Sequence, residues 1–194
     1  MSLHESAAGG SERTRRTIIE ATVRMLAEHG TAATLRDVAE ASGISKSGLL
    51  HHFPDKENLI WHVVVDFLDR FRAEVLSRVD LSENRPGKLL RAYLRTLCDP
   101  SPEALSDYHS FAAMCDSLNE TDAVAEVIDR DNEQWREQWR EQLLADGLDL
   151  ETVLVVKYAA EGLATASSYD EFVRSEGMRR ALPTLLALTE KNAP

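Results

Sequence analysis

The sequence contains few cysteines, glycines and prolines, and it has no long apolar run. Two cysteines, Cys98 and Cys115, are too few for a disulfide scaffold. We expect small buried hydrophobic residues at both positions rather than a redox pair. No apolar stretch approaches the roughly 18 residues of a membrane-spanning helix, and residues 1–12 lack the apolar centre of a signal peptide. These absences predict a protein of the reducing cytoplasm with no membrane partner.

Positive charge is also scarce. Lys and Arg number 22 against 33 Asp and Glu, which gives a formal net charge of -11. Such a chain is not a general binder of polyanions, so any contact with nucleic acid must come from a local patch. Residues 59–194 hold most of the acidic excess, whereas residues 11–50 are close to neutral. Arg13, Arg15 and Arg16 cluster where an N-terminal arm could reach phosphates.

The long stretches between the sparse glycines and prolines are rich in Ala, Leu, Glu, Arg and Gln, which favour helix. We therefore predict an all-α protein of about nine helices. They lie near residues 12–29, 35–42, 46–52, 55–79, 87–98, 102–118, 122–146, 150–168 and 175–191, after a disordered arm at 1–11. The β-branched runs 63–65 and 153–156 are interpreted as buried helix, and Asp146-Gly147 as a helix end. Pro183 predicts a later start or a kink in the last helix.

Residues 35–52 have the pattern of a helix-turn-helix. Thr34 and Ser45 are suited to cap its two helices, and Gly43 suits a left-handed turn between them. The apolar contacts are expected from Leu35, Val38, Ala39, Ile44, Leu49 and Phe53. Residues 46–48 are then left as small or polar positions near the start of the second helix. That arrangement is typical of a helix that enters the major groove of DNA.

The stretch from Thr34 to Leu59, TLRDVAEASGISKSGLLHHFPDKENL, resembles the signature of the tetracycline-repressor (TetR) family. The match covers roughly residues 13–60. The resemblance implies a homodimer with a three-helix DNA-binding domain at 12–56. A larger helical domain at 57–194 would bind an effector and dimerise through the helices near 150–168 and 175–191. The expected function is a repressor, not an enzyme, released from a palindromic DNA operator by an unidentified small molecule, with no cofactor.

Carried over by position, the resemblance implies DNA contacts from Thr34, Arg36, Ser45, Lys46, Ser47, Gly48, His51, His52 and Lys56. Arg36 and Lys46 are expected to read bases, and Thr34 and Lys56 to hold phosphates. Gly48 stands where the family often has Thr, so that contact is missing or is replaced by close backbone approach. Leu50 stands where a phosphate-binding Tyr is common. No metal site is expected, because the adjacent His51 and His52 do not share a helix face.

Aromatic, sulfur and imidazole side chains of the larger domain are candidates for a mostly apolar effector pocket. They are Tyr93, Tyr108, His109, Phe111, Met114, Cys115, Trp135, Trp139 and Tyr158. The alternative for each is a core or interface position. Small residues in 158–166 and the leucines of the last helix favour close packing in a dimer. The acidic charge of this domain favours a cationic or neutral effector over an anion.

Three alternatives remain open from the sequence. The first is a helical protein-interaction module whose helix-turn-helix no longer binds DNA, which the residues at positions 48 and 50 allow. The second is an enzyme with a site around Cys115 and His109, although no nucleophile–base motif supports it. The third is an activator, or a repressor that needs its ligand, because the sign of regulation is not written in the DNA-reading residues.

Overall fold

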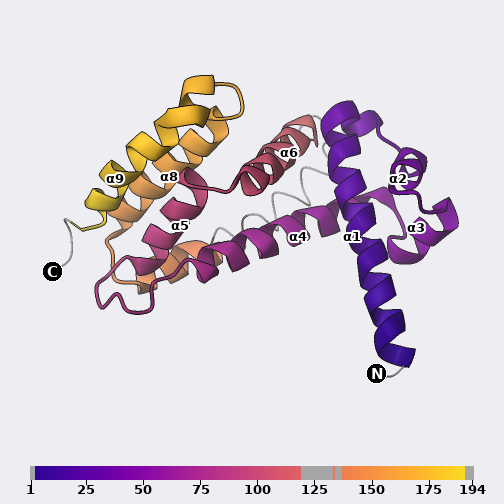
Figure 1. The fold of residues 1–194 in the computed structure, drawn as a ribbon, viewed down its shortest axis with the longest axis horizontal. Coiled ribbons are helices and arrows are strands. Elements are labelled where there is room, and N and C mark those ends of the chain that lie inside the picture. Colours follow the sequence, from indigo (N-terminus) through magenta and orange to yellow (C-terminus); the bar gives the residue numbers. More distant parts are fainter. Residues whose placement is uncertain (1–2, 119–132, 134–136, 191–194) are drawn as a thin grey trace. The chain divides into compact units, whose positions relative to one another are not determined.

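The computed structural model describes residues 3–118, 133 and 137–190, and the regular structure in these ranges is helical, without a strand (Figure 1). The predicted all-α class is therefore confirmed. The main helices are α1 (Leu3–His29), α2 (Leu35–Ser42), α3 (Lys46–His52), α4 (Lys56–Ser77), α5 (Lys88–Cys98), α6 (Pro102–Leu118), α8 (Leu150–Ala166) and α9 (Met178–Leu188). Residues 137–145 are also helical. A short 3-10 helix, η1 (Gly30–Ala32), follows α1, and a π-helical turn, η2 (Val173–Gly177), precedes α9.

Several predicted boundaries agree with the structure. α2 and α3 begin and end at the predicted residues, and α6 begins at the predicted Pro102. Gly147 has φ 88° and donates from its N–H to the carbonyl of Leu144, so Asp146-Gly147 is a helix end, as predicted. The valine-rich runs 63–65 and 153–156 lie in α4 and α8, as expected. Most of the predicted helix at 122–146 lies outside the described residues.

Two expectations about the ends of the chain were wrong. Residues 3–11, expected to be disordered, form the first turns of α1. Extending an existing helix costs much less than nucleating one. This short segment, which has few apolar residues, therefore continues α1 toward the N-terminus. Of the two alternatives for Pro183, a start of the last helix after this residue was wrong, because α9 contains it, and a kink there stays a prediction. Pro183 and Arg179 are exposed, so water can bind the Arg179 carbonyl that receives no N–H from proline.

The chain divides into two compact units. The first unit comprises residues 1–68 and 110–130, and the second comprises residues 69–109 and 131–194. α4 and α6 each contribute residues to both units. In the first unit α2 packs against α1 and α3 (Figure 1). Its buried core consists of Ile18, Ile19, Ala21, Leu26, Ala33, Val38, Ala39, Leu49, Phe53, Leu59, Ile60, Val63, Val64 and Met114.

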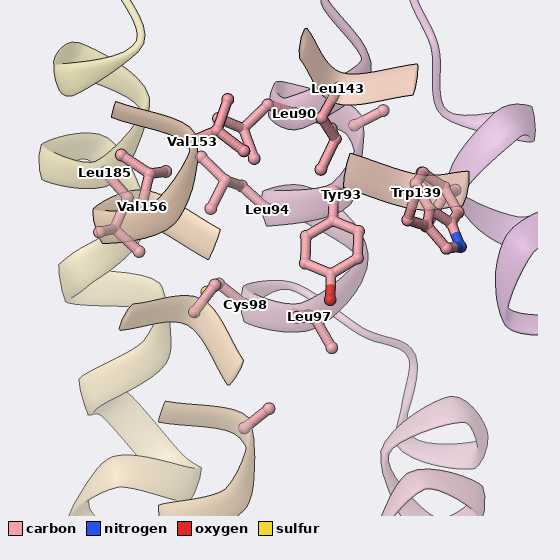
Figure 2. Close-up of a cluster of buried hydrophobic side chains, with 14 of the residues drawn as sticks. Leu90, Tyr93, Leu94, Leu97, Cys98, Trp139, Leu143, Val153, Val156 and Leu185 are labelled. Atoms are coloured by element: carbon pink, nitrogen blue, oxygen red, sulfur yellow. The ribbon is translucent and has the colours of Figure 1, made fainter. Parts of the chain in front are cut away.

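The core of the second unit is built around α5, which is buried on nearly all sides. Figure 2 shows Leu90, Leu94 and Cys98 of α5 beside Val153 and Val156 of α8. Leu185 of α9 completes this contact, and Tyr93 lies on the side of Trp139. Burial of apolar surface of this kind is the main stabilising contribution to a helical domain. Cys98 is a small buried residue, as predicted.

Candidate nucleic-acid interface

The start of α2 is fixed by a capping box between Thr34 and Asp37. The N–H of Asp37 donates to Thr34 Oγ1 at 3.3 Å, and the N–H of Thr34 donates to Asp37 Oδ2 at 2.8 Å. The hydrogen bonds that the Thr34 hydroxyl and, secondly, the Thr34 N–H donate to the Asp37 carboxylate lower the pKa of Asp37. The predicted N-cap is therefore confirmed. The Thr34 hydroxyl also donates to Asp37 at 2.7 Å, so capping already engages this exposed side chain.

The turn between α2 and α3 is a Schellman motif centred on Gly43. Gly43 has φ 68°, and its N–H donates to the Glu40 carbonyl while the N–H of Ile44 donates to the Ala39 carbonyl. Ser45 then caps α3 by accepting a hydrogen bond from the N–H of Gly48 at 3.1 Å. The left-handed glycine, the second cap and the partial burial of Ile44 agree with the sequence prediction.

The two faces of α3 differ in character. Leu49 is fully buried on one face, and Phe53, which follows the helix, is buried with it. His52 is half-buried beside the Phe53 ring, with ring centroids 6.3 Å apart. The opposite face is exposed and carries Lys46, Ser47, Leu50 and His51. We call these four residues the exposed face of α3.

The predicted DNA contacts are therefore only partly gathered on one surface. Ser45 and Arg36 are exposed, as are the three predicted contacts on the exposed face of α3. Gly48 is half-buried, and a Cβ there would lie 3.1 Å from Ile44 Cγ2 and 3.1 Å from Ser45 Oγ. The close contacts of Gly48 are therefore with Ile44 and Ser45 of its own turn. Lys56 is half-buried at the start of α4, and burial lowers the pKa of its ammonium group.

Arg15 does not extend toward solvent as an arm residue, contrary to the expectation. It is half-buried and donates from Nη2 to Nδ1 of His62 at 2.8 Å. Its guanidinium lies 5.0 Å from the centroid of the Phe53 ring. His62 also contacts Phe53, with ring centroids 5.5 Å apart. This cluster fixes the end of α3 to α1 and α4, and the sequence analysis missed it because Arg15 and His62 are 47 positions apart.

We expect the His62 contact to make stability depend on pH. Burial and the Arg15 guanidinium lower the pKa of His62 below the ordinary histidine value of about 6.5. The unfolded chain then binds more protons than the folded chain just below pH 6.5, so the free energy of unfolding should fall as pH drops through this region. Urea unfolding between about pH 5.5 and 8 measures the slope. A His62→Gln variant should show a smaller slope.

The comparison with His62→Gln is needed because the pKa of His109 is also lowered, by burial and by Arg174. Both proteins contain His109, so the difference between their pH profiles reports His62 alone. Identical profiles would contradict the prediction.

The nine candidate pocket residues are distributed between the two units. Phe111, Met114 and Cys115 belong to the core of the first unit or pack against it. Phe111 stacks on Phe67 with ring centroids 3.8 Å apart. Tyr158 is 55% exposed on α8, and Trp135 lies outside the described residues. The second unit therefore holds two buried candidates, Tyr93 and Trp139, and two half-buried ones, Tyr108 and His109.

Those candidates are accompanied by polar partners from α8. The Tyr93 hydroxyl donates to the Glu161 carboxylate, and Lys157 Nζ lies 2.6 Å from the same carboxylate oxygen. Burial and Glu161 raise the pKa of Tyr93. His109 Nε2 lies 2.7 Å from Ser167 Oγ. Lys157 and Glu161 lie at the border between the buried and the exposed side of α8, and Lys157 Nζ lies 4.4 Å from the centroid of the exposed Tyr158 ring.

The exposed side of α8 carries several large apolar residues. Its exposed apolar residues, which we call the α8 apolar face, are Leu150, Leu154, Val155 and Tyr158. Tyr169 and Phe172, which follow the helix, are also exposed. Soluble monomers rarely expose contiguous apolar surface of this kind, which commonly marks a protein–protein interface.

Other kinds of site find little support in the described part of the chain. No group of three His, Cys, Asp or Glu residues there is placed to hold a metal ion. Burial raises the pKa of Cys98 to about 11 and that of Cys115 to about 12, which disfavours the nucleophilic thiolate. None of the described helices combines the length and apolar character needed to cross a membrane.

Comparison with known proteins adds two family matches. The model of the family described as "Bacterial regulatory proteins, tetR family" matches residues 18–63, which include the helix-turn-helix. The model described as "Tetracyclin repressor-like, C-terminal domain" matches residues 87–190, more than half of the chain. The two matches together cover helices from both units.

Curated relatives and solved structures agree with these matches. The transcriptional repressor KstR2 of Rhodococcus jostii is 33% identical over 110 residues, covering 54% of this chain and 50% of the relative. The repressor AcnR of Corynebacterium glutamicum is 41% identical over 87 residues, covering 43% and 46%. The chain thus spans about half the length of the curated relatives it matches. A transcriptional regulator from Rhodococcus sp. Rha1 has the same fold, with a TM-score of 0.74, 20% identity and coverage of 92% and 97%.

Proposed function

Because the chain belongs to the TetR family of bacterial regulatory proteins, we propose that it represses transcription by binding a DNA operator as a homodimer. A small-molecule effector releases it from the operator. The observation that carries the DNA-binding part is the exposed face of α3, which is polar around Leu50 and follows a capped helix and a Schellman turn. A helix held in this way can enter the major groove. The names of the curated relatives support repression.

Within this function, residues 12–56 form the DNA-binding domain and residues 57–194 the effector-binding and dimerisation domain. Lys46 and Arg36 read guanine edges, which present two acceptors to a cationic side chain. Ser47 and His51 add polar contacts from the exposed face of α3. Further DNA contacts at the edges of the interface come from Thr34, Ser45, Gly48, His52 and Lys56. Of these, Lys56 holds a phosphate.

The homodimer forms through the α8 apolar face and α9. A two-fold axis places the same surface of both protomers in contact, so one apolar face covers the other. The two copies of α3 must then lie about 34–36 Å apart to reach successive major grooves on one side of the duplex. This spacing predicts an inverted-repeat operator.

The effector binds among Tyr93, Tyr108, His109 and Trp139 in the second unit. The Lys157–Glu161 pair already balances the charge of the Glu161 carboxylate, and the remaining polar groups are hydroxyls and an imidazole. These groups favour a neutral or cationic molecule with an aromatic or aliphatic body. α4 contributes residues to both units, so an effector that prefers a different position of α4 lowers DNA affinity, and DNA lowers effector affinity by the same factor.

Selection of bound sequences from a random duplex library, without ligand, tests this proposal. Recovery of one inverted-repeat site is the expected result. Absence of enrichment, together with salt-insensitive or absent binding to DNA, would favour a protein-interaction module instead. Enrichment only after a metabolite extract is added would favour a regulator that needs its ligand.

Substitution of Lys46 and of Lys56 should have different consequences for DNA binding. Lys46→Ala should cost roughly 1–3 kcal/mol of operator affinity and relax base preference at one position of each half-site. Lys56→Gln should weaken all sequences alike and reduce the slope of log affinity against log salt by about one. Titrations of operator and random duplexes at several salt concentrations measure both effects. An equal loss on both duplexes for Lys46→Ala would rule out its role in base reading.

A further inference from the structure

Leu50 is an exposed apolar residue on an otherwise polar surface. It is 38% exposed, whereas the neighbouring Leu49 is fully buried. It takes no part in the core of the first unit, to which Leu49, Phe53 and Val38 all belong. Folding therefore does not account for a leucine at this position. Its neighbours on the exposed face of α3 are Lys46, Ser47 and His51.

The chemistry of the major groove offers one apolar partner for such a side chain. Base edges there present hydrogen-bond donors and acceptors, and thymine adds its C5-methyl group. A leucine side chain has no donor for a phosphate or a base acceptor. We propose that Leu50 is a specificity-determining residue that packs on the C5-methyl group of a thymine in each half-site. This inference rests on the proposed DNA binding.

The register of α3 places this thymine relative to the base read by Lys46. The two residues are four positions apart on one face, so their Cα atoms are separated by about 6 Å along the helix axis. Successive base pairs are spaced by about 3.4 Å. A helix that follows the groove therefore puts the thymine about two base pairs from the guanine contacted by Lys46, on either strand.

A methyl contact has a distinct physical signature. It displaces no counterion, so loss of the Leu50 side chain should leave the salt dependence of binding unchanged. Removal of a phosphate contact at the same position would instead lower the slope of log affinity against log salt. Leu50→Ala keeps a good helix former on the exposed surface, so the fold of α3 is retained.

The test replaces each thymine of the selected operator, one at a time, with deoxyuridine, which lacks only the methyl group. For the unchanged protein, one position per half-site should weaken binding about fourfold, the equivalent of about 0.8 kcal/mol for one buried CH₂ group. Replacement in both half-sites should weaken binding about 15-fold. Leu50→Ala should bind the thymine and deoxyuridine operators equally well at that position. Leu81→Ala, a matched change at an 83% exposed leucine in the second unit, should keep the full difference.

The outcomes separate this inference from the proposed function. Failure of the unchanged protein to select any operator would overturn both. Operator binding that is insensitive to deoxyuridine at every position would overturn the role of Leu50 and leave DNA recognition standing. The role of Leu50 would also be overturned if Leu50→Ala keeps the fourfold difference. A lower salt slope for Leu50→Ala would overturn it too, because that change indicates a contact near phosphates.

Discussion

Replacement of both Val155 and Tyr158 by glutamate should give a monomer that no longer holds its operator. Val155 is 62% exposed and Tyr158 55% exposed, at the centre of the α8 apolar face. In a two-fold dimer each substitution places carboxylates from both protomers in one interface, where burial of unpaired like charges is strongly unfavourable. Loss of the second DNA-binding domain then removes the gain from bivalent binding, about 10²–10⁴-fold in affinity.

Light scattering after gel filtration gives the mass, and fluorescence anisotropy with a labelled operator gives the affinity. The control is Leu81→Glu, which puts one glutamate on an exposed leucine of the second unit outside α8. This variant should remain a dimer and bind the operator normally. Circular dichroism should show that both proteins remain helical. A double-glutamate protein that stays dimeric would place the interface elsewhere.

Replacement of Arg91 by methionine should destabilise the second unit by about 3–5 kcal/mol. Arg91 is only 1% exposed, and its Nε lies 3.0 Å from Glu83. Its Nη1 donates to the Pro86 carbonyl at 2.8 Å and to Thr189 Oγ1 at 3.2 Å. Methionine fills similar volume, but it leaves the Pro86 and Thr189 acceptors without this donor, and the largely buried Glu83 carboxylate with Arg85 as its remaining cation.

The lowered pKa of Glu83 also indicates that Arg91 stabilises this carboxylate. Burial alone would raise it, but hydrogen bonds and charge from Arg85 and Arg91 outweigh burial and hold the pKa below its usual range. Because the carboxylate is the favoured form, removal of Arg91 leaves a charge with less compensation. Adding Glu83→Gln to Arg91→Met should therefore recover part of the lost stability.

Urea unfolding at equal protein concentration measures these differences, since the proposed dimerisation would add a concentration-dependent contribution. Arg16→Met is the matched control. Arg16 forms an exposed pair with Glu20 on α1, and such pairs contribute about 0–1 kcal/mol. An Arg91→Met protein no less stable than the control would show that the buried network contributes little.

The sequence predicted the helix-turn-helix well because its signals are local. The caps at Thr34 and Ser45, the left-handed Gly43 and the apolar spacing to Leu49 all act within a few residues of the structure that they determine. Local signals of this strength fix both the type and the bounds of an element. The polar surface of α3 followed from the same spacing.

Contacts between distant residues were not predictable in the same way. Tyr108 and Phe111 are three positions apart on α6, yet they pack in different units. Periodicity shows that both face inward but not which core receives them. Arg15 was expected in an arm that could reach phosphates because it clusters with Arg13 and Arg16, and only the fold brings His62 to it. The candidate pocket in the second unit therefore excludes Phe111, Met114 and Cys115, which pack in the first unit.

The burial of Cys98 and the partial burial of Cys115 have a practical consequence for spectroscopy. Because Cys98 and Cys115 are held as thiols with raised pKa values, they react slowly with reagents that require a thiolate. A single cysteine introduced at an exposed site outside the proposed DNA contacts, such as Ala41 on α2, can then be labelled selectively in an otherwise unchanged chain. Spin labels at that site in the two protomers of the proposed dimer would report the separation of the two helix-turn-helix motifs. The change in this distance with effector or operator could be followed in solution without crystals.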